Sequence, residues 1–582
     1  MSERSGVRFW ARGAYCLASA ALGLVVIAGL ANAAPVIPGT AQPGAVERTL
    51  QQQLPTVHQD HIQIPAPSGF ATPPGAETFH FTLQQIVVDG ASALPTDAVA
   101  ATYAELIGKD VSAAQIYDVA RRITDLYSKA GYALSFALVP AQEIDKSKGV
   151  VRIDAVEGYV GEVRYEGDTE GLAKIVGEYG ENITQSKPLK TATLERYLLL
   201  MNDLPGYKIR GVFDHIDNAP KGDTRLIVKV EYRPIDVSSE IDNRGSKAFG
   251  PRQAGVTATM NSMLGQGESV MIHALRALNA NQLSAVVGRI TVPISSNGLA
   301  FSLDATYSDG HPGSAALSAL HFASNGWTVA AQLNYPLLRG RTQSLWLWGG
   351  VNGKWLSSAL AATPNSRDHL YELQAGATWN ERDDAGITAA TATLTQGLDV
   401  FDATTSASLL RSRQAGSGEF TALSGTITRL QPLSQTSAGD VDLYAAAMGQ
   451  VASRGLLAAE QCGYGGATFG RGYDANEIVG DHCLLGTVEL RLTPDLGDTW
   501  SGGTVSAVQL FAVVDAGETW NTGHLGIGDK ASENGASVGF GARFALLERA
   551  NASIEFDQPL GHAVALEGNH AGRVFFQIGI AN

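Results

Sequence analysis

The pattern of hydrophobic and polar residues changes character near Pro234. Beyond this point apolar and polar residues alternate in several stretches, among them 301–307, 327–335 and 574–580. Successive side chains of a β-strand point to opposite faces, so the alternation predicts strands with one apolar and one polar face. About 350 residues of such strands exceed a single soluble sandwich, whereas a lipid-facing barrel requires this alternation. We therefore expect residues 234–582 to form a transmembrane antiparallel β-barrel of about 16 strands.

The preceding residues, 78–233, combine helical and strand-like patterns in an order that occurs twice. The elements of the first copy are expected at 81–88, 95–107, 113–130, 132–139 and 150–156. Those of the second copy are expected at 160–165, 172–179, 194–200, 207–213 and 226–230. Two tandem β-α-α-β-β units constitute an internal repeat. We expect two small α+β domains, at 78–157 and 158–233.

The N-terminal part has the pattern of an exported protein. Three arginines precede a long apolar run, and Ala31-Asn32-Ala33 supplies the small residues that signal peptidase accepts. This predicts a signal peptide over residues 1–33, with an uncleaved helical anchor as the alternative. A helix at 45–54 is expected within the next region, 34–54, and a Pro-rich linker at 55–77.

Composition limits the possible classes of protein. The 582 residues carry a formal net charge of −15, with 17% charged and 45% hydrophobic residues. An acidic balance argues against a nucleic-acid-binding protein, which needs a basic face for phosphates. The low charge and moderate hydrophobicity fit neither a disordered chain nor a helical membrane protein. A soluble β-propeller or β-helix is the alternative to the barrel, but no repeat of about 40–50 residues supports it.

The cysteines also fit an exported protein. Cys16 lies in the predicted signal peptide, which leaves Cys462 and Cys483 in the mature chain. Two cysteines in an oxidising compartment predict one disulfide. There is no Cys-x-x-Cys pattern, so a metal site is not expected.

Two common catalytic motifs are missing from the sequence. We find no phosphate-binding loop and no His-Glu-x-x-His. His58 and His61 are spaced as metal ligands can be, but they lie in the Pro-rich linker without partners in the sequence. We therefore predict that the protein is not an enzyme and uses no cofactor or metal.

Several short motifs occur in a characteristic order along the chain. They are Arg48-Thr-Leu-Gln-Gln-Gln53, Gly131-Tyr-Ala-Leu134, Val139-Pro-Ala-Gln142, Val156-Glu-Gly158, Asp242-Asn-Arg-Gly-Ser246, Phe469-Gly-Arg-Gly-Tyr473, Gly480-Asp481, Glu489-Leu-Arg491 and Val513-Val-Asp-Ala-Gly517. Through them the chain resembles the outer-membrane transporters of two-partner secretion, the haemolysin and filamentous-haemagglutinin transporter type. These belong to the superfamily of barrels that carry periplasmic POTRA domains. The resemblance implies a barrel in the bacterial outer membrane with two POTRA domains in the periplasm.

The resemblance also implies a lock inside the barrel. In the family the Arg-Gly-Tyr motif lies at the tip of a long loop folded into the barrel, where the arginine pairs with an aspartate of the inner wall. Carried over, Arg471 would pair with Asp515. Gly472 would allow a tight turn, and Tyr473 would wedge against the wall. Gly470 replaces the usual Val or Ile, which predicts a looser tip. The alternative is a solvated arginine in an ordinary extracellular loop.

The predicted disulfide brackets this segment. A Cys462–Cys483 bond would staple either the base of the inward-folded loop or an ordinary surface loop, and the sequence leaves both open. The helix at 45–54 corresponds to a segment that, in the family, plugs the resting pore.

The function implied by the resemblance is protein export. POTRA domains would capture an unfolded exoprotein in the periplasm by strand addition, and the barrel would conduct it outward without ATP. The partners would be a secreted adhesin, cytolysin or toxin with an N-terminal secretion domain, outer-membrane lipid and, during biogenesis, the barrel-assembly machinery. A factor that inserts other outer-membrane barrels is the alternative function. A diffusion porin would have no use for two periplasmic domains.

Overall fold

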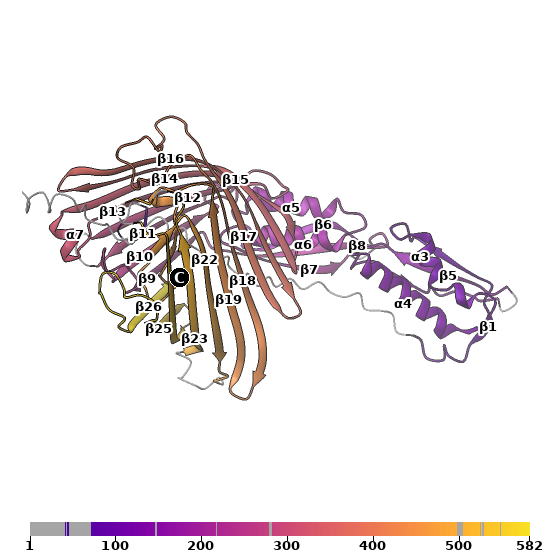
Figure 1. Cartoon of the computed structure of the whole chain (residues 1–582). Coiled ribbons are helices and arrows are strands. Elements are labelled where there is room, and N and C mark those ends of the chain that lie inside the picture. Colours follow the sequence, from indigo (N-terminus) through magenta and orange to yellow (C-terminus); the bar gives the residue numbers. More distant parts are fainter. Residues whose placement is uncertain are drawn as a thin grey trace, which may run out of the picture.

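The computed structural model describes residues 41, 44, 45 and 72–582, except 146–147, 217, 279–281, 497–504, 524, 527–528 and 548. The predicted signal peptide, and most of the region at 34–54 and of the linker at 55–77, lie outside the described residues. Figure 1 shows a barrel from which two small domains extend one after the other. None of the helices in the described part of the chain combines the length and the apolar character that a membrane span requires.

The first domain lies at the end of the molecule that is remote from the barrel (Figure 1). Its elements are β1 (His80–Thr82), β2 (Gln85–Asp89), α3 (Thr96–Ala101), η2 (Ala104–Leu106), β3 (Asp110–Ser112), α4 (Ala113–Lys129), β4 (Phe136–Leu138) and β5 (Val150–Val156). The order in the main sheet is β2-β5-β4, with β2 parallel and β4 antiparallel to β5, while β1 pairs with β3.

Two strands of this domain differ from the sequence-based expectation. The segment predicted as one strand at 81–88 is divided, because Leu83 bonds through its backbone to Gly108 and Lys109 instead of continuing the sheet. The strand predicted at 132–139 is reduced to Phe136–Leu138. Beyond it, the side-chain amide of Gln142 bonds to both the N–H and the C=O of Arg152, each at 2.8 Å, in place of a further strand residue.

Helix α4 shows how the local sequence specifies its element. Ser112 and Gln115 form a capping box at its N-terminus, each side chain accepting a hydrogen bond from the other residue's backbone N–H. Ile116, Val119 and Ile123 follow at helical spacing and are buried in the domain core. The helix therefore packs one apolar face against the sheet.

The second domain repeats this plan next to the barrel. Its elements are β6 (Tyr159–Gly167), α5 (Lys174–Thr184), α6 (Thr191–Asn202), β7 (Tyr207–His215) and β8 (Asp223–Tyr232), in the sheet order β6-β8-β7. The core is formed by apolar residues of both helices and of the central strand, among them Val176, Leu198 and Leu226. The element order of the predicted repeat is thus present in both domains.

The two domains are joined by direct contacts. Nζ of Lys221 lies 2.8 Å from Oδ2 of Asp154, and Thr191 N–H donates to the C=O of Gly131 at 2.8 Å.

Glu157, at the end of the first domain, accepts hydrogen bonds from Ala93 N–H at 2.6 Å and from the Tyr127 hydroxyl at 2.9 Å. Burial alone would raise the pKa of Glu157, but these bonds and one from Ser92 hold it below its ordinary value.

The barrel is a closed sheet of 16 strands. The strands are β9 (Ile235–Asp242), β10 (Gln253–Asn261), β11 (Ser269–Ala277), β12 (Leu283–Pro293), β13 (Ala300–Gly310), β14 (Phe322–Arg339), β15 (Gln343–Leu360), β16 (Thr363–Asp383), β17 (Gly386–Gly397), β18 (Thr421–Thr436), β19 (Gly439–Ala452), β22 (His482–Thr493), β23 (Val505–Trp520), β24 (Ser532–Leu546), β25 (Ala550–Pro559) and β26 (Arg573–Ala581). A short helix, α7 (Ala315–Ala319), precedes β14. All neighbouring strands are antiparallel, and β26 closes the barrel on β9.

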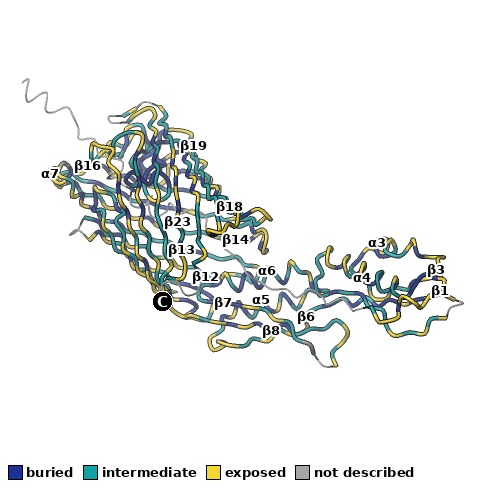
Figure 2. The backbone as a smooth tube through the Cα atoms, turned by 90° about the horizontal axis from the view of Figure 1, so that it is seen from below, coloured by how far each residue is buried: buried dark blue, intermediate teal, exposed yellow. Residues whose placement is uncertain are grey.

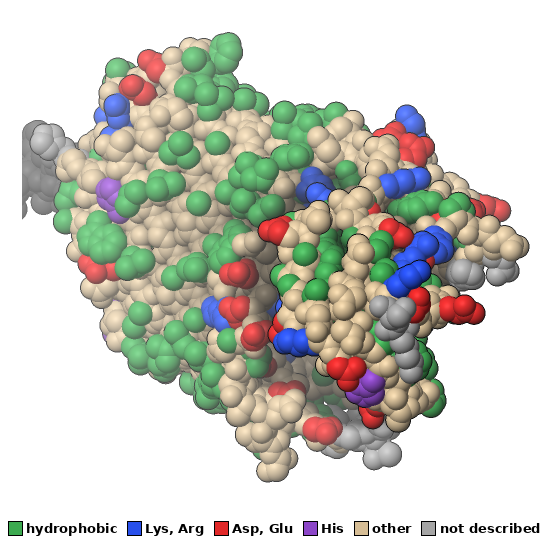
Figure 3. Space-filling model, turned by 90° about the vertical axis from the view of Figure 1, so that its right-hand side faces the viewer, with side chains coloured by type: hydrophobic (Ala, Val, Ile, Leu, Met, Phe, Trp, Pro, Cys, Tyr) green, Lys and Arg blue, Asp and Glu red, His purple; other side chains and the backbone are tan. Residues whose placement is uncertain are grey.

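Apolar and polar side chains lie on opposite faces of the barrel wall. On β23, Val514 is 56% exposed on the outside, whereas its neighbour Asp515 is 1% exposed on the inside. Figure 2 shows this alternation of exposed and buried residues along the strands. In Figure 3 apolar side chains spread over the visible outer wall, while charged side chains gather mainly on the periplasmic domains. This is the arrangement that lipid outside and polar groups inside require.

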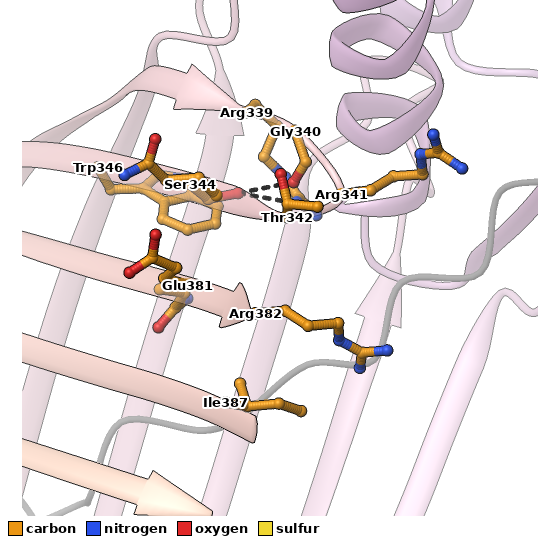
Figure 4. A pocket seen from close by; sticks show the side chains of 11 residues that line it. Arg339, Gly340, Arg341, Thr342, Ser344, Trp346, Glu381, Arg382 and Ile387 are labelled. Atoms are coloured by element: carbon orange, nitrogen blue, oxygen red, sulfur yellow. Dashed lines mark hydrogen bonds between the residues drawn. The ribbon is translucent and has the colours of Figure 1, made fainter. Parts of the chain in front are cut away.

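The second domain is docked on the periplasmic rim of the barrel. Arg339 at the end of β14 forms a bidentate pair with Asp203, at 2.6 and 2.8 Å, and Arg341 lies 2.6 Å from Glu195 of α6. Figure 4 shows Arg341 extending towards a helix from this turn, with Ser344 hydrogen-bonded to Arg339 and Gly340. The ion pairs fix one side of the domain under the barrel.

Candidate functional site

A long segment between β19 and β22 folds back into the barrel. It contains η3 (Ala458–Glu460), β20 (Cys462–Tyr464) and β21 (Ile478–Gly480), and the two strands pair with each other as a separate hairpin. Tyr464 is fully buried, and a β-carbon at Gly517 or Gly535 on the wall would lie 2.5 Å from its ring. Because these glycines are register partners on β23 and β24, they form a notch for the tyrosine. We call residues 453–481 the inward loop.

The Arg471 side chain of the inward loop lies among carboxylates of the barrel wall. Its Nη1 is 2.7 Å from Glu489 Oε2 and 3.2 Å from Glu555 Oε1. Its guanidinium group also stands over the ring of Phe511, with 5.8 Å between its carbon and the ring centroid. The arginine therefore bridges β22 and β25 inside the lumen, and it is buried there.

Asp515 contacts the same residue through a different atom. Its Oδ2 accepts the backbone N–H of Arg471 at 2.8 Å and the hydroxyl of Ser537 at 3.1 Å. The sequence-based expectation of a pair between guanidinium and carboxylate thus differs from the geometry. The turn of the loop brings the backbone of Arg471, rather than its side chain, to β23, and the side chain continues to Glu489.

Glu489 and Glu555 are wall residues that the sequence analysis did not assign to the site. Glu489 is fully buried and contacts Arg471, Arg491 at 2.6 Å and Arg543 at 2.7 Å. The signal for Glu489 was present in the Glu489-Leu-Arg491 motif, because strand periodicity places both charged residues on one face. An acidic group facing three arginines is charge-compensated only while they stay close.

The residues around Arg471 fit the turn closely. Gly470 has a φ of +80°, and a β-carbon there would lie 2.6 Å from the ring of Tyr464. The expected looser tip is therefore not seen, because Tyr464 fills the space that a Val or Ile side chain would take. A β-carbon at Gly472 would lie 2.9 Å from Pro559 N, so the backbone approaches the wall closely. Tyr473 is buried, stacks on His562 and accepts a hydrogen bond from Gly561 N–H at 3.1 Å.

A second ion pair follows in the same turn. Asp474 pairs with Arg573 of β26, and its Oδ2 accepts the N–H of Lys247 at 3.1 Å. Arg244 of the segment after β9 pairs with Glu555, which also contacts Arg471. The motif that begins at Asp242 thus contributes a charge to the network. Asn243 bonds through its side chain to Phe576 N–H at 2.7 Å and Val574 C=O at 2.9 Å, and so extends the β9–β26 pairing.

Cys462 and Cys483 form a disulfide at the base of the inward loop. Cys462 begins β20, Cys483 lies in β22, and their Cα atoms are 6.3 Å apart. Both residues pack in the apolar cluster that contains Tyr464, Phe469 and Tyr473. The disulfide thus joins the loop to the wall beside the residues that fill the lumen.

Arg413 connects the extracellular segments above the inward loop. It comes from the long connection between β17 and β18, and its guanidinium lies 2.7 Å from Asp481 and 3.1 Å from Asp529. It also donates to the C=O of Leu456 at 2.5 Å and to Asn521 at 3.2 Å. Asp481, from the Gly480-Asp481 motif, is fully buried in this cluster. One arginine therefore ties three extracellular connections together at the exit of the barrel. We call Arg413, Asp481, Asp529 and Asn521 the exit cluster.

The described residues of the N-terminal region also lie inside the molecule. Ala41 is fully buried in an apolar cluster with Phe249 and Leu317. The C=O of Ala45 accepts a hydrogen bond from Asn476 of the inward loop at 3.2 Å. These contacts bring the start of the predicted helix at 45–54 to the loop, while the rest of that helix lies outside the described residues.

A groove on the first domain is a second candidate site. It has a volume of about 430 Å³ and lies between α4 and the edge strand β4. Its lining residues are Tyr117, Asp118, Ala120, Arg121, Arg122, Thr124, Asp125, Ala137, Leu138 and Val139. The N–H of Ala137, which faces the groove, donates to the hydroxyl of Thr124 at 2.9 Å. The groove therefore combines a strand edge with charged and apolar side chains.

A closed barrel that holds its own loop and carries small α+β domains on one side is the fold of outer-membrane barrels that bear POTRA domains. The model of the family described as "Haemolysin secretion/activation protein ShlB/FhaC/HecB" matches residues 222–544, and the chain belongs to this family. A model described as "POTRA domain, ShlB-type" matches residues 81–158. The protein is thus located in the outer membrane, with its POTRA domains in the periplasm.

Individual relatives agree with this assignment. The heme/hemopexin transporter protein HuxB of Haemophilus influenzae is 24% identical over 263 residues, 45% of this chain and 46% of HuxB. The outer membrane transporter CdiB of Escherichia coli O6:K15:H31 is 26% identical over 235 residues, 39% of each chain. In both comparisons the matched region thus covers less than half the length of the relative.

Solved structures show the same fold. CdiB from Escherichia coli matches with a TM-score of 0.72 and 20% identity, covering 94% of this chain and 100% of that chain. CdiB from Acinetobacter baumannii matches with a TM-score of 0.62 and 14% identity, covering 92% and 96%.

Proposed function

We propose that this protein exports an unfolded partner exoprotein across the outer membrane, capturing it with its POTRA domains and conducting it through the barrel without ATP. The observation that carries the proposal is a barrel lumen occupied by the chain's own loop, in a molecule whose first periplasmic domain carries a groove along a strand edge. A polar conduit that is filled by a removable segment suits a transported chain better than a permanently open channel. The partner is a secreted adhesin, cytolysin or toxin with an N-terminal secretion domain.

The first domain supplies the capture site in this proposal. Its groove offers an edge strand, β4, to which an extended chain can add by backbone hydrogen bonds. Thr124 occupies the N–H of Ala137, so an added strand must displace this hydroxyl. Such recognition reads the backbone and the alternation of side chains, and it needs no nucleotide.

Deletion of the capture site tests the function. Co-expression with the product of an adjacent large open reading frame should place that product in the medium only when the full chain is present. Removal of residues 78–157 should abolish its appearance, while the heat-modifiable barrel remains in the outer membrane. Secretion by the truncated chain would refute capture by the first domain. A Thr184→Val variant, altered on the second domain, serves as a control for non-specific loss.

The inward loop acts as the lock of the conduit. Arg471, Gly472, Tyr473 and Asp515 hold its tip against the wall, and the Cys462–Cys483 disulfide holds its base. In this role the contacts position the loop rather than catalyse a reaction. In this proposal, transport changes the loop or its surroundings, because the loop contacts the wall inside the lumen.

The alternative is a factor that inserts other barrels into the membrane. A templating factor of this kind would need an open strand edge within the membrane. Here β9 and β26 are paired from Gln577↔Asp242 to Ala581↔Ser238, and the side chains of Asn243 and Asn582 extend the pairing at its two ends. The closed seam favours export.

A further inference from the structure

A continuous row of aromatic side chains crosses the outer wall of the barrel. Tyr307 and Trp327 have ring centroids 4.7 Å apart, and Trp327 is the register partner of Trp355. Trp355 lies 5.9 Å from Tyr371, which lies 5.2 Å from Phe401. The first four residues belong to β13, β14, β15 and β16, whereas Phe401 belongs to the connection between β17 and β18. We call these five residues the aromatic row.

The aromatic row lies where the outer wall changes from apolar to polar. On the periplasmic side of the row, the next outward residues are apolar. They are Val329 on β14, Gly353 and then Val351 on β15, and Leu373 on β16. Towards the outside, two positions further along the same strands, they are polar: Asn325, Ser357 and His369. Asn325 and Ser357 bond to each other at 2.8 Å. Tyr and Trp concentrate at the border between hydrocarbon and headgroups, so the row marks the outer-leaflet interface.

Phe401 is the member of the aromatic row that lies outside the strands. Its side chain is 91% exposed, and its φ of 55° lies in the left-handed region, which is rare for a non-glycine residue. An apolar ring in water and a strained backbone are both unfavourable, so the position needs a compensating interaction.

The structure holds Phe401 in place through its neighbour. The carboxylate of Asp402 lies 2.6 Å from Nδ1 of His369 and accepts the hydroxyl hydrogen of Tyr371 at 2.6 Å. The backbone on either side is bonded to the same strand, since Leu398 N–H donates to Tyr371 C=O and Thr404 N–H to His369 C=O, both at 2.8 Å. We call the contacts of Asp402 with His369 and Tyr371 the pin. His369 and Tyr371 point outward, as Leu373 does, so the pin lies on the outer wall.

We propose that Phe401 inserts into the outer leaflet of the membrane and anchors the β17–β18 connection to lipid. The partner is the lipid surface, because the ring continues the lipid-facing wall on which Trp355 and Tyr371 lie. Transfer of the ring from water to the interface offsets the backbone strain. The same connection carries Arg413, so it is attached to lipid near its start and to the exit cluster near its end. This role is independent of the proposed function in export.

Collision accessibility of a nitroxide tests the anchor in the full chain. The label is attached to Phe401→Cys, in a Cys16→Ser background with the Cys462–Cys483 disulfide intact, in liposomes of phosphatidylethanolamine and phosphatidylglycerol. Labels at Leu373→Cys on the lipid-facing wall and at Ala438→Cys in the exposed β18–β19 turn are the references. We expect the label at 401 to favour collisions with oxygen over a water-soluble nickel chelate, several-fold more than the label at 438.

A second variant separates the pin from the ring. Asp402→Ala should shift the label at 401 towards the value at 438, whereas Asp399→Ala, three residues earlier in the connection, should leave it unchanged. A label at 401 that behaves as at 438 would overturn the lipid anchor. Low accessibility to both reagents would also overturn it, and would indicate a contact with protein instead. An Asp402→Ala variant without any shift would overturn the role of the pin.

Discussion

At the scale of single residues, charges in the lumen depend on one another. Glu489 is compensated by Arg471, Arg491 and Arg543, and Arg471 also contacts Glu555. Burying one such group without its partners is costly, whereas the complete set is tolerated. The residues therefore act as a unit that holds the inward loop in a defined position.

The first prediction concerns this unit. Arg471→Ala and Glu489→Gln should each weaken the docking of the loop, by less than the roughly 3–5 kcal/mol of a buried charge that loses its last partner, because each removes one member of the charge network while other members remain. Both should cut secretion strongly without preventing barrel insertion, as should Asp515→Ala. The Arg471→Ala/Glu489→Gln double variant should lose little more than either single one. Secretion and heat modifiability measure the two effects.

The comparison with Asp515 makes the test specific. If Arg471 and Asp515 also act through one contact, their double variant should likewise cost little more than a single one. Because Asp515 binds the backbone N–H of Arg471, we expect this coupling to be weaker than that with Glu489. Fully additive losses for both pairs would contradict a common lock.

A second prediction at this scale concerns pH. Hydrogen bonds lower the pKa of Glu157 below its ordinary value of 4.5, so its contribution to stability is complete above that pH. The contribution is lost as the pH falls through the lower pKa of the folded state. Amide protection factors around Ala93 and Tyr127, which correct for the intrinsic pH dependence of exchange, should fall in this acidic range. Glu157→Gln should remove the pH dependence, and an unaltered profile in that variant would show that other groups cause it.

At the scale of elements, the extracellular connections close the barrel together. The exit cluster joins the connections after β17, β19 and β23 through Arg413. The disulfide beside it closes a loop with a sequence separation of 21 residues. In the chain-entropy model a disulfide that closes a loop of this size stabilises the folded state by about 3 kcal/mol. The inward loop is thus fixed at its base and covered from outside.

The prediction for the exit cluster is an increase in conductance. Arg413→Ala should leave Asp481 buried without its cation and loosen the extracellular connections, so single-channel conductance in planar bilayers should rise. Arg411→Ala is the matched control, because Arg411 bonds only within its own connection, to Ser408 and Gln414, among the contacts described. Equal conductance of the two variants would show that the cluster does not close the exit.

At the scale of the whole molecule, the chain brings Ala41 and Ala45 to the barrel, while its POTRA domains lie outside it. Ala41 is buried in an apolar cluster of the barrel and Ala45 contacts the inward loop, although the first strand of the POTRA domains, β1, begins at His80. A helix of about ten residues is marginal in isolation, so leaving the lumen costs little. We therefore propose that the region at 34–54 plugs the resting pore and leaves during transport.

Deletion of residues 34–54 tests the plug. Single-channel conductance should increase, because the deletion empties part of the lumen, while secretion of the partner should remain largely intact. An Asn476→Ala variant, which removes the bond to Ala45, should raise conductance less than the deletion. Unchanged conductance of the deletion variant would remove the plug from the model of the resting state.

Much of the architecture was accessible from local patterns. Alternation with a period of two predicted a transmembrane barrel of about 16 strands, and the closed sheet with Val514 outside and Asp515 inside confirms that fold. Helical spacing predicted the helix at 113–130, and α4 spans Ala113–Lys129. These features depend on neighbouring residues and on the solvent each face meets, so the sequence contains them directly.

The contacts within the lumen were decided only by the tertiary structure. A motif placed Arg471 at the tip of a loop, but which carboxylate meets its side chain depends on the shear of the closed barrel, which brings Glu489 and Glu555 to the same place. Gly470 predicted a loose tip, yet Tyr464, six residues earlier, fills that space. The sequence alone thus determined the elements and their faces, because these follow from periodicity and burial. The pairing of charges across strands is fixed by register and closure, which no local pattern encodes.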